Sequence, residues 1–173
     1  MTIYKDALTE EMTNLGKLEN IVFVGQQIVY AGNPMSTTLG GVDKGKMIEL
    51  PVMEESQMGF SLGLAMTGKT VITFYPRWDF IILAANQLIN HVDKFTLMTG
   101  KKINLFIRLG KGSDKPLDPG HQHKGNYLKE FKSMCPNINF YDLLTPDNVR
   151  HSYQHCSKHG GVNVLVEYPE LYY

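Results

Sequence analysis

Apolar residues along the chain alternate between short continuous runs and helix-spaced stripes. The continuous runs are NIVFVG (20–25), TVITFYP (70–76), INLFIRLG (103–110), NINFYDLL (137–144) and VNVLVEYP (162–169). Their length and their content of β-branched and aromatic residues predict buried strands. The shorter segment MIELP (47–51) favours one more strand, so we expect five or six in all.

Helical spacing of apolar residues lies between these runs. The first stripe consists of Ile3, Ala7, Leu8, Met12 and Leu15. Further helices are expected from about Ser56 to Thr67, from about Asp79 to Met98, over NYLKEFKSM (126–134), and from Asp147 to His159. Strands that alternate with helices and are apolar on both faces predict an α/β fold, a three-layer sandwich with a mostly parallel sheet. Because no repeat, linker or low-complexity tract interrupts the pattern, we expect a single domain over 1–173.

Ligands of such open sheets bind beyond the carboxyl ends of the strands. The segments at those ends are GQQIVYAG (25–32), LPVMEES (50–56), YPRWDF (75–80) and LGKGSDKPLDPGHQH (109–123). We therefore expect the functional site among these four segments.

Composition narrows the classes of partner. The formal net charge is zero, so no basic excess favours nucleic acid or anionic lipid. The N-terminal residues lack the pattern of a signal peptide, and no apolar run approaches the roughly 20 residues of a membrane span. The two cysteines, Cys135 and Cys156, suit a reducing compartment. We expect a cytoplasmic protein that has no membrane or nucleic-acid partner.

Two adjacent carboxylates, Glu54 and Glu55, open an apolar helix spaced by glycines. At a helix start they can act on the surface, where the helix dipole stabilises each by about 0.3–1 kcal/mol. Alternatively, one of them is buried and holds or lends a proton. The residues alone leave both alternatives open.

The segment 50–90 resembles the core of the pyrimidine-binding domain of thiamine-diphosphate enzymes. The resemblance depends on Glu54 followed nine residues later by Gly63, on the aromatic strand end FYPRWDF (74–80), and on a helix that contains ANQLIN (85–90). It is strongest to the beta subunits of 2-oxo acid (pyruvate and branched-chain) dehydrogenase decarboxylases and weaker to transketolase and deoxyxylulose-phosphate synthase. It extends over nearly the whole chain and implies the thiamine-diphosphate-binding fold.

The resemblance implies a role for the carboxylate. In the family, a glutamate forms a hydrogen bond with N1′ of the cofactor's aminopyrimidine and thereby favours the imino tautomer. The imino nitrogen removes the proton from C2 of the thiazolium ring, and the resulting ylide attacks a 2-oxo acid. Glu54 matches this position, and Glu55 is the alternative if the register shifts by one. Phe80 matches an aromatic that stacks on the pyrimidine, or else is core. Trp78 is a candidate pocket wall or interface residue. Gln27 is a candidate polar contact, beside Gln26, where the family has acids.

Histidines supply further candidates. The segment DPGHQHKG (118–125) resembles a family loop whose histidine handles the acyl-cofactor intermediate, so His121 and His123 are both candidates; otherwise they are simply solvated. HSYQHCSKH (151–159) spaces three histidines at i, i+4 and i+8, which suits either a zinc ion or a solvated helix face. LGKGSDK (109–115) suits either a phosphate cradle of backbone N–H groups or a mobile loop, and it lacks the full P-loop pattern.

The resemblance also implies a partner. The chain contains no GDG motif, with which the family holds the diphosphate through magnesium, and it ends at PELYY, where the dehydrogenase beta subunits continue into a C-terminal domain. We expect a partner subunit that carries the diphosphate domain and most contacts to magnesium, in an alpha2beta2 heterotetramer. The expected activity is decarboxylation of a 2-oxo acid with acyl transfer or carboligation. The alternatives are a dehydrogenase subunit that delivers acyl groups to lipoamide, and a non-catalytic assembly or regulatory subunit.

Overall fold

The computed structural model describes residues 2–30, 32–115 and 118–173, within which a single sheet contains six parallel strands. The strands are β1 (Ile21–Gly25), β2 (Met47–Glu49), β3 (Thr70–Tyr75), β4 (Asn104–Gly110), β5 (Asn139–Asp142) and β6 (Gly161–Glu167). Their order across the sheet is β2-β1-β3-β4-β6-β5. Each predicted run forms a strand. Residue 31 in the predicted segment 25–32 lies outside the described residues, and so do residues 116 and 117 in the predicted segment 109–123.

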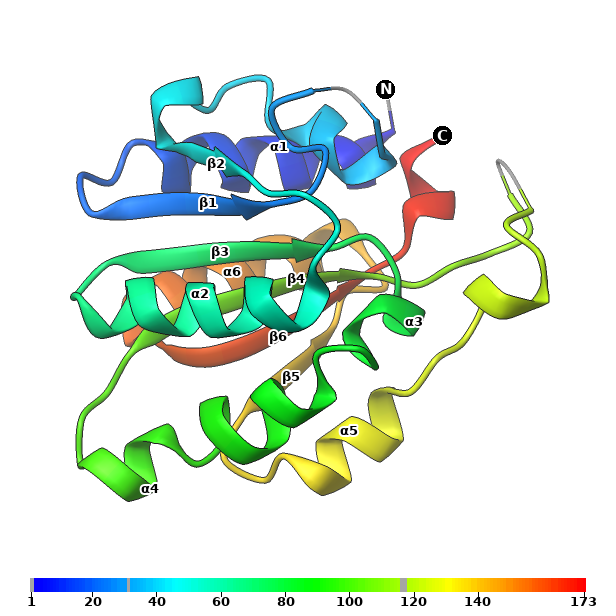
Figure 1. Ribbon diagram of the computed structural model, residues 1–173. Coiled ribbons are helices and arrows are strands. Elements are labelled where there is room, and N and C mark those ends of the chain that lie inside the picture. The colour runs from blue at the N-terminus through cyan, green and yellow to red at the C-terminus, as the bar shows by residue number, and fades with distance from the viewer. Residues whose placement is uncertain (1, 31, 116–117) are drawn as a thin grey trace.

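Helices cover both faces of the sheet (Figure 1). On one face lie α1 (Ile3–Gly16) and α6 (Pro146–His159), which pack against each other. On the other face lie α2 (Glu54–Met66), α3 (Trp78–Ile81), α4 (Phe95–Thr99) and α5 (Leu128–Met134). The short helices are η1 (Pro34–Thr38), η2 (Lys44–Lys46), η3 (Gln87–Val92), η4 (His121–His123) and η5 (Pro169–Tyr172). This arrangement confirms the predicted three-layer α/β sandwich.

The predicted helix from Asp79 to Met98 is divided into α3, the π-helical turn η3, and α4. At the wide turn, the N–H of Asp93 donates to the carbonyl of Leu88, five residues back. The buried Asp93 carboxylate then accepts from the backbone and side-chain N–H groups of Asn137, at 2.8 and 3.1 Å. Although burial alone would raise the pKa of Asp93, bonds from Lys94 and Asn137 lower it. The π turn thus ties this helical layer to the approach of β5.

A buried ion pair joins the two strands beside the middle of the sheet. The guanidinium of Arg108 on β4 donates through Nε and Nη2 to both carboxylate oxygens of Glu167 on β6. Both side chains are fully buried. Tyr153 of α6 donates to the same carboxylate at 2.9 Å, and Tyr172 of η5 donates to it as well. Thr38 of η1 accepts from Arg108 Nη1 at 3.1 Å. One charged pair therefore connects five elements.

The two cysteines are free thiols in the interior. Burial raises the pKa of both Cys135 and Cys156 to about 11, so both are protonated at neutral pH. In the part of the chain that the structure describes, no helix combines the length and the apolar character needed to cross a membrane.

The ion pair leads to a stability prediction. We expect Arg108→Met to lower the free energy of unfolding by about 3–5 kcal/mol, because Glu167 would be left as a buried charge without its cation. Urea titration of the purified chain measures this loss. Arg150→Met is the matched control: Arg150 lies on the surface near Glu10, and its loss should cost less than about 1 kcal/mol. Equal losses in the two variants would contradict the assigned role of the buried pair.

Candidate functional site

A cavity of about 530 Å³ lies at the carboxyl edge of the sheet. All four segments that the sequence places at this edge contribute to its lining. The lining residues from these segments are Gln26, Gln27, Gly32, Leu50, Pro51, Val52, Glu54, Pro76, Arg77, Phe80, Lys111, Gly112, Ser113, Lys115 and Pro119. The lining is completed by Asn33, by Pro34 and Met35 of η1, by Glu49 at the end of β2, and by Pro169. The parallel direction of the strands explains why segments so distant in sequence meet here.

Glu54 lies in the wall of this cavity, at the first residue of α2. It is 7% exposed, and the hydroxyl of Tyr75 at the end of β3 donates to its backbone carbonyl at 3.0 Å. Within the described residues, no group donates a hydrogen bond to its carboxylate, so both oxygens can accept from a ligand. Glu55 is exposed and lies outside the lining. Burial therefore separates the pair: the surface interpretation fits Glu55, and the cavity interpretation fits Glu54.

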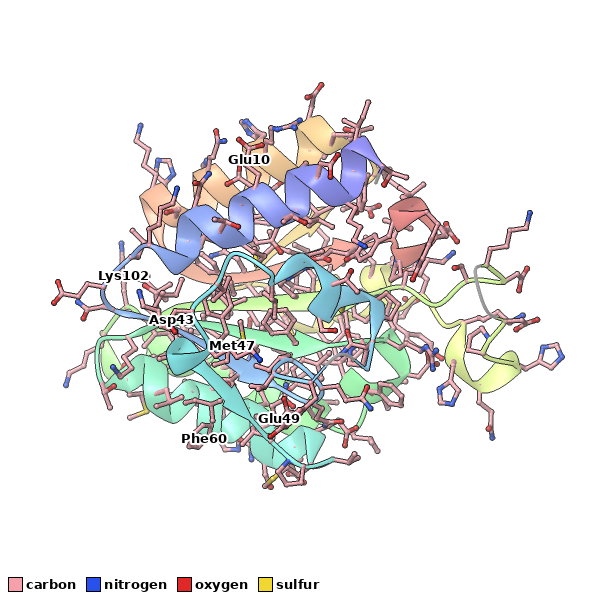
Figure 2. The ribbon with its side chains drawn as sticks, turned by 90° about the horizontal axis from the view of Figure 1, so that it is seen from above. Glu10, Asp43, Met47, Glu49, Phe60 and Lys102 are labelled. Atoms are coloured by element: carbon pink, nitrogen blue, oxygen red, sulfur yellow. The ribbon has the colours of Figure 1, made fainter. Side chains whose placement is uncertain are left out.

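The loop after β1 is held by a carboxylate that sequence reasoning did not select. Glu49, at the end of β2, accepts hydrogen bonds from the backbone N–H groups of Gln27, Ile28 and Val29. Gln27 adopts a left-handed backbone with φ of 56°, which is uncommon for a residue other than glycine. Glu49 thereby fixes the turn that brings Gln27 to the rim of the cavity (Figure 2 labels Glu49). The signal for Glu49 was its position at a strand end.

The two aromatic candidates separate in space. Phe80 is half-buried and lines the cavity. Trp78 is fully buried and does not line it, so its assignment as a pocket wall or interface residue does not fit its position. Its ring packs edge-on against Tyr127 and, with 5.5 Å between centroids, against Phe131 of α5. Large aromatic rings gain most from full burial, and here α5 provides the apolar surface.

The histidine loop returns to the cavity because its two ends touch. A Cβ added at Gly112 would overlap the backbone carbonyl of His123, so only glycine permits this approach. Lys124 forms ion pairs with Asp114 and Asp118, which raise the pKa of Lys124. These contacts close the loop. They also place its second histidine, rather than its first, against Phe80.

His123 packs against Phe80, with 5.4 Å between ring centroids. Its Nδ1 is buried and has no hydrogen-bond partner among the described residues. His121, two residues earlier, is exposed. The structure therefore brings His123 against Phe80, which lines the cavity together with Glu54. His123 itself is not a lining residue, and His121 lies at the surface.

The three histidines of α6 lie on its exposed face, remote from the cavity lining. The ring of His155 lies 6.2 Å from that of His151 and 4.1 Å from that of His159, measured between centroids. Within the described ranges, no three histidine, cysteine or carboxylate side chains are arranged to hold a metal ion. The solvated-face interpretation therefore fits this stripe.

The arrangement suits a flat heterocycle. A buried carboxylate with free acceptor atoms can bind a ring nitrogen that carries a proton, and the Phe80 ring offers a stacking surface. The aminopyrimidine of thiamine diphosphate has such a ring, so the residues present fit that group. The imidazole of His123 beside Phe80 supplies a group that can give or take a proton.

Comparison with known proteins shows a consistent relationship. No family model matches the chain. It is 25% identical to the pyruvate dehydrogenase E1 component subunit beta of Chaetosphaeridium globosum over 97% of this chain and 51% of that protein. The corresponding subunit of Cyanidium caldarium is 30% identical over 68% of this chain and 37% of that protein. The chloroplastic beta-3 subunit of Arabidopsis thaliana is 24% identical over 97% and 41%, respectively.

The chain thus spans about half the length of these relatives or less. Among solved structures, a split-gene transketolase, described as an inactive beta4 tetramer, matches with a TM-score of 0.73 and 15% identity. The match covers 96% of this chain and 51% of that one, and it shows a shared fold. Over nearly its whole length, the chain is therefore similar in sequence to pyruvate dehydrogenase E1 beta subunits and has a transketolase-like fold, which confirms the resemblance that the Glu54 segment indicated.

Proposed function

We propose that this chain is the pyrimidine-binding subunit of a split thiamine-diphosphate-dependent enzyme that acts on a 2-oxo acid. The observation that carries the proposal is the buried Glu54 carboxylate, which accepts no hydrogen bond from the described residues and lines a cavity together with Phe80. The similarity to E1 beta subunits supports the same cofactor. When bound, thiamine diphosphate supplies the electron sink for cleavage of the carbon–carbon bond beside the keto group.

Each residue of the site then has a role. Glu54 accepts a hydrogen bond from the pyrimidine ring and holds the proton at that ring nitrogen. Phe80 stacks on the pyrimidine and excludes water from one of its faces. His123 gives or takes a proton at the substrate side, through the nitrogen that has no partner within the described chain. Gln27 contributes a polar side chain at the rim.

A partner subunit is proposed to complete the site and to hold the diphosphate and magnesium. The outer face of α2, next to Glu54, supports this proposal. Phe60 on this face is 43% exposed and lies on the outer side of the helix (Figure 2). A Cβ at Gly63 would meet nothing within 4 Å, so packing inside this chain does not require glycine there. A glycine beside an exposed aromatic allows a second backbone to approach closely.

The finer assignments are also proposals. We favour an alpha2beta2 heterotetramer that decarboxylates a 2-oxo acid and transfers the acyl group or joins it to a carbonyl acceptor. Delivery to lipoamide is the alternative, which the names of the pyruvate dehydrogenase relatives support. The cytoplasmic location stays a prediction.

The first test concerns the two glutamates. In the complex of this chain with its co-purifying partner, we expect Glu54→Gln to lower thiamine-dependent turnover by roughly 100-fold or more, because the amide cannot hold the proton. The fold, followed by circular dichroism, should be unchanged. Glu55→Gln is the matched control and should be nearly neutral. Reversed outcomes would move the role to Glu55, and full activity in both variants would contradict the proposed function.

The second test concerns the two histidines. We expect His123→Ala to reduce kcat by roughly 100-fold, with little change in the Kd of thiamine diphosphate, because a proton-transferring group is lost. His121→Ala should have a small effect, since His121 is exposed. Steady-state kinetics and calorimetry measure the two quantities. A pure loss of cofactor affinity in His123→Ala would be inconsistent with the assigned role.

The third test concerns the partner. We expect Phe60→Glu to weaken association by about 2 kcal/mol or more, since it would bury a charge at the proposed contact. Analytical ultracentrifugation of the mixed subunits measures the change. Met98→Glu is the control, because Met98 is also an exposed apolar residue, 63% accessible, but belongs to another helix, α4. If both variants associate as the wild type does, α2 is not the contact.

A further inference from the structure

Arg77 and Lys111, two of the three basic residues that line the cavity, follow the ends of neighbouring strands. Strands β3 and β4 pair in parallel, with Tyr75 opposite Leu109. Two residues beyond this pair, the chain places Arg77 and Lys111, and both line the cavity. The backbones stay close in between, because a Cβ on Gly110 would overlap the carbonyl oxygen of Pro76. Neither cation could be singled out from the sequence.

Neither charge is neutralised by an ion pair within the described residues. Lys111 Nζ lies 5.9 Å from the centroid of the Tyr168 ring, which orients the ammonium without cancelling its charge. Lys124 on the same loop provides the contrast, because it pairs with Asp114 and Asp118.

Within the described residues, the two carboxylates of the cavity lining, Glu49 and Glu54, do not pair with these cations. Glu49 already accepts three backbone N–H groups of the loop after β1. Glu54 is the carboxylate proposed to hold the pyrimidine ring. Unpaired cations in a concave site concentrate positive potential, and a guanidinium bonds to carboxylate or phosphate through charge-assisted bonds. This wall of the cavity therefore favours an anionic ligand group.

We infer that Arg77 and Lys111 select 2-oxo acids that carry a second anionic group at the end remote from the keto carbon. This inference rests on the proposed function. In that reaction, the bond between the keto carbon and its carboxylate breaks, the carboxylate carbon leaves as CO2, and the electron pair stays on the keto carbon. Because this carboxylate leaves, cations that bound it would lose their partner during the reaction. We therefore assign Arg77 and Lys111 to an anionic group that stays on the substrate throughout. The second anionic group is a carboxylate or a phosphate, because both accept charge-assisted hydrogen bonds from guanidinium and ammonium groups.

The kinetic test uses the complex of the full chain with its co-purifying partner, thiamine diphosphate and magnesium. The substrates are 2-oxoglutarate and 2-oxopentanoate, which have equal chain length but differ in the terminal carboxylate. We expect a higher kcat/KM for 2-oxoglutarate. Arg77→Gln and Lys111→Gln should each reduce this preference by about 10-fold, as expected for one charge-assisted hydrogen bond.

Lys102→Gln is the matched control. It removes the same charge from an exposed lysine that precedes β4, at the end of the molecule opposite η4 (Figure 2). It should leave the preference unchanged. Equal kcat/KM values for the two acids, or an unchanged preference in both cavity variants, would overturn the inference and leave the proposed function standing. A loss of thiamine diphosphate affinity without a change in preference would show that the cations hold the cofactor, which also overturns it.

A binding measurement on the chain alone separates the two claims. Titrations with glutarate, pentanoate and inorganic phosphate, followed by NMR shifts, should show binding of glutarate or phosphate, stronger than that of pentanoate and weakened by Arg77→Gln. The stronger of the two anions identifies the second group as carboxylate or phosphate. If the complex turns over neither acid but this pattern is found, the anion site stands and the proposed enzyme function fails. Absence of the pattern overturns the anion site.

Discussion

The ion pair between Arg108 and Glu167 holds together the strands and helices that position the cavity. Removing two charges from water is costly, and this cost is offset only when every donor and acceptor of the pair is bonded. Two tyrosine hydroxyls, a threonine hydroxyl and the Phe74 ring 4.8 Å from the guanidinium carbon provide that environment. As a result, β4, β6, α6, η1 and η5 meet in one arrangement. The residues that follow these strands reach the cavity from fixed positions.

Beyond the strands, local contacts shape the cavity. Glu49 accepts hydrogen bonds from three backbone N–H groups and so fixes the loop after β1. In the loop after β4, Gly112 allows a close approach to the backbone of His123, which brings the two ends of that loop together. Each contact involves the backbone of the loop. The side chains of Gln27 and His123 are therefore positioned without taking part in these contacts. The outcome is a cavity lined by the Glu54 carboxylate and the Phe80 ring, with the imidazole of His123 packed against that ring. Arg77 and Lys111 in the same lining form no ion pair within the described residues.

Much of the fold could be predicted from the sequence, since strands that are apolar on both faces and alternate with helices have few alternatives to a covered parallel sheet. The edge that carries the cavity followed from strand direction alone. Glu54 could be selected by its distance from Gly63 in a known type of segment. Arg77 and Lys111 lie in the predicted segments, and Glu49 lies just before one of them, but none of the three belongs to such a motif, so the sequence did not mark them.

What the sequence by itself determined was the α/β class, the strands, and the set of four segments that meet at one edge. Only the tertiary structure decided which members of that set face the cavity. It buried Glu54 and exposed Glu55, turned Trp78 toward α5 while Phe80 kept a cavity face, and brought His123 rather than His121 against that ring. Neighbouring residues are chemically alike in sequence. Their environments differ because burial, ring packing and charge pairing depend on contacts between segments far apart along the chain.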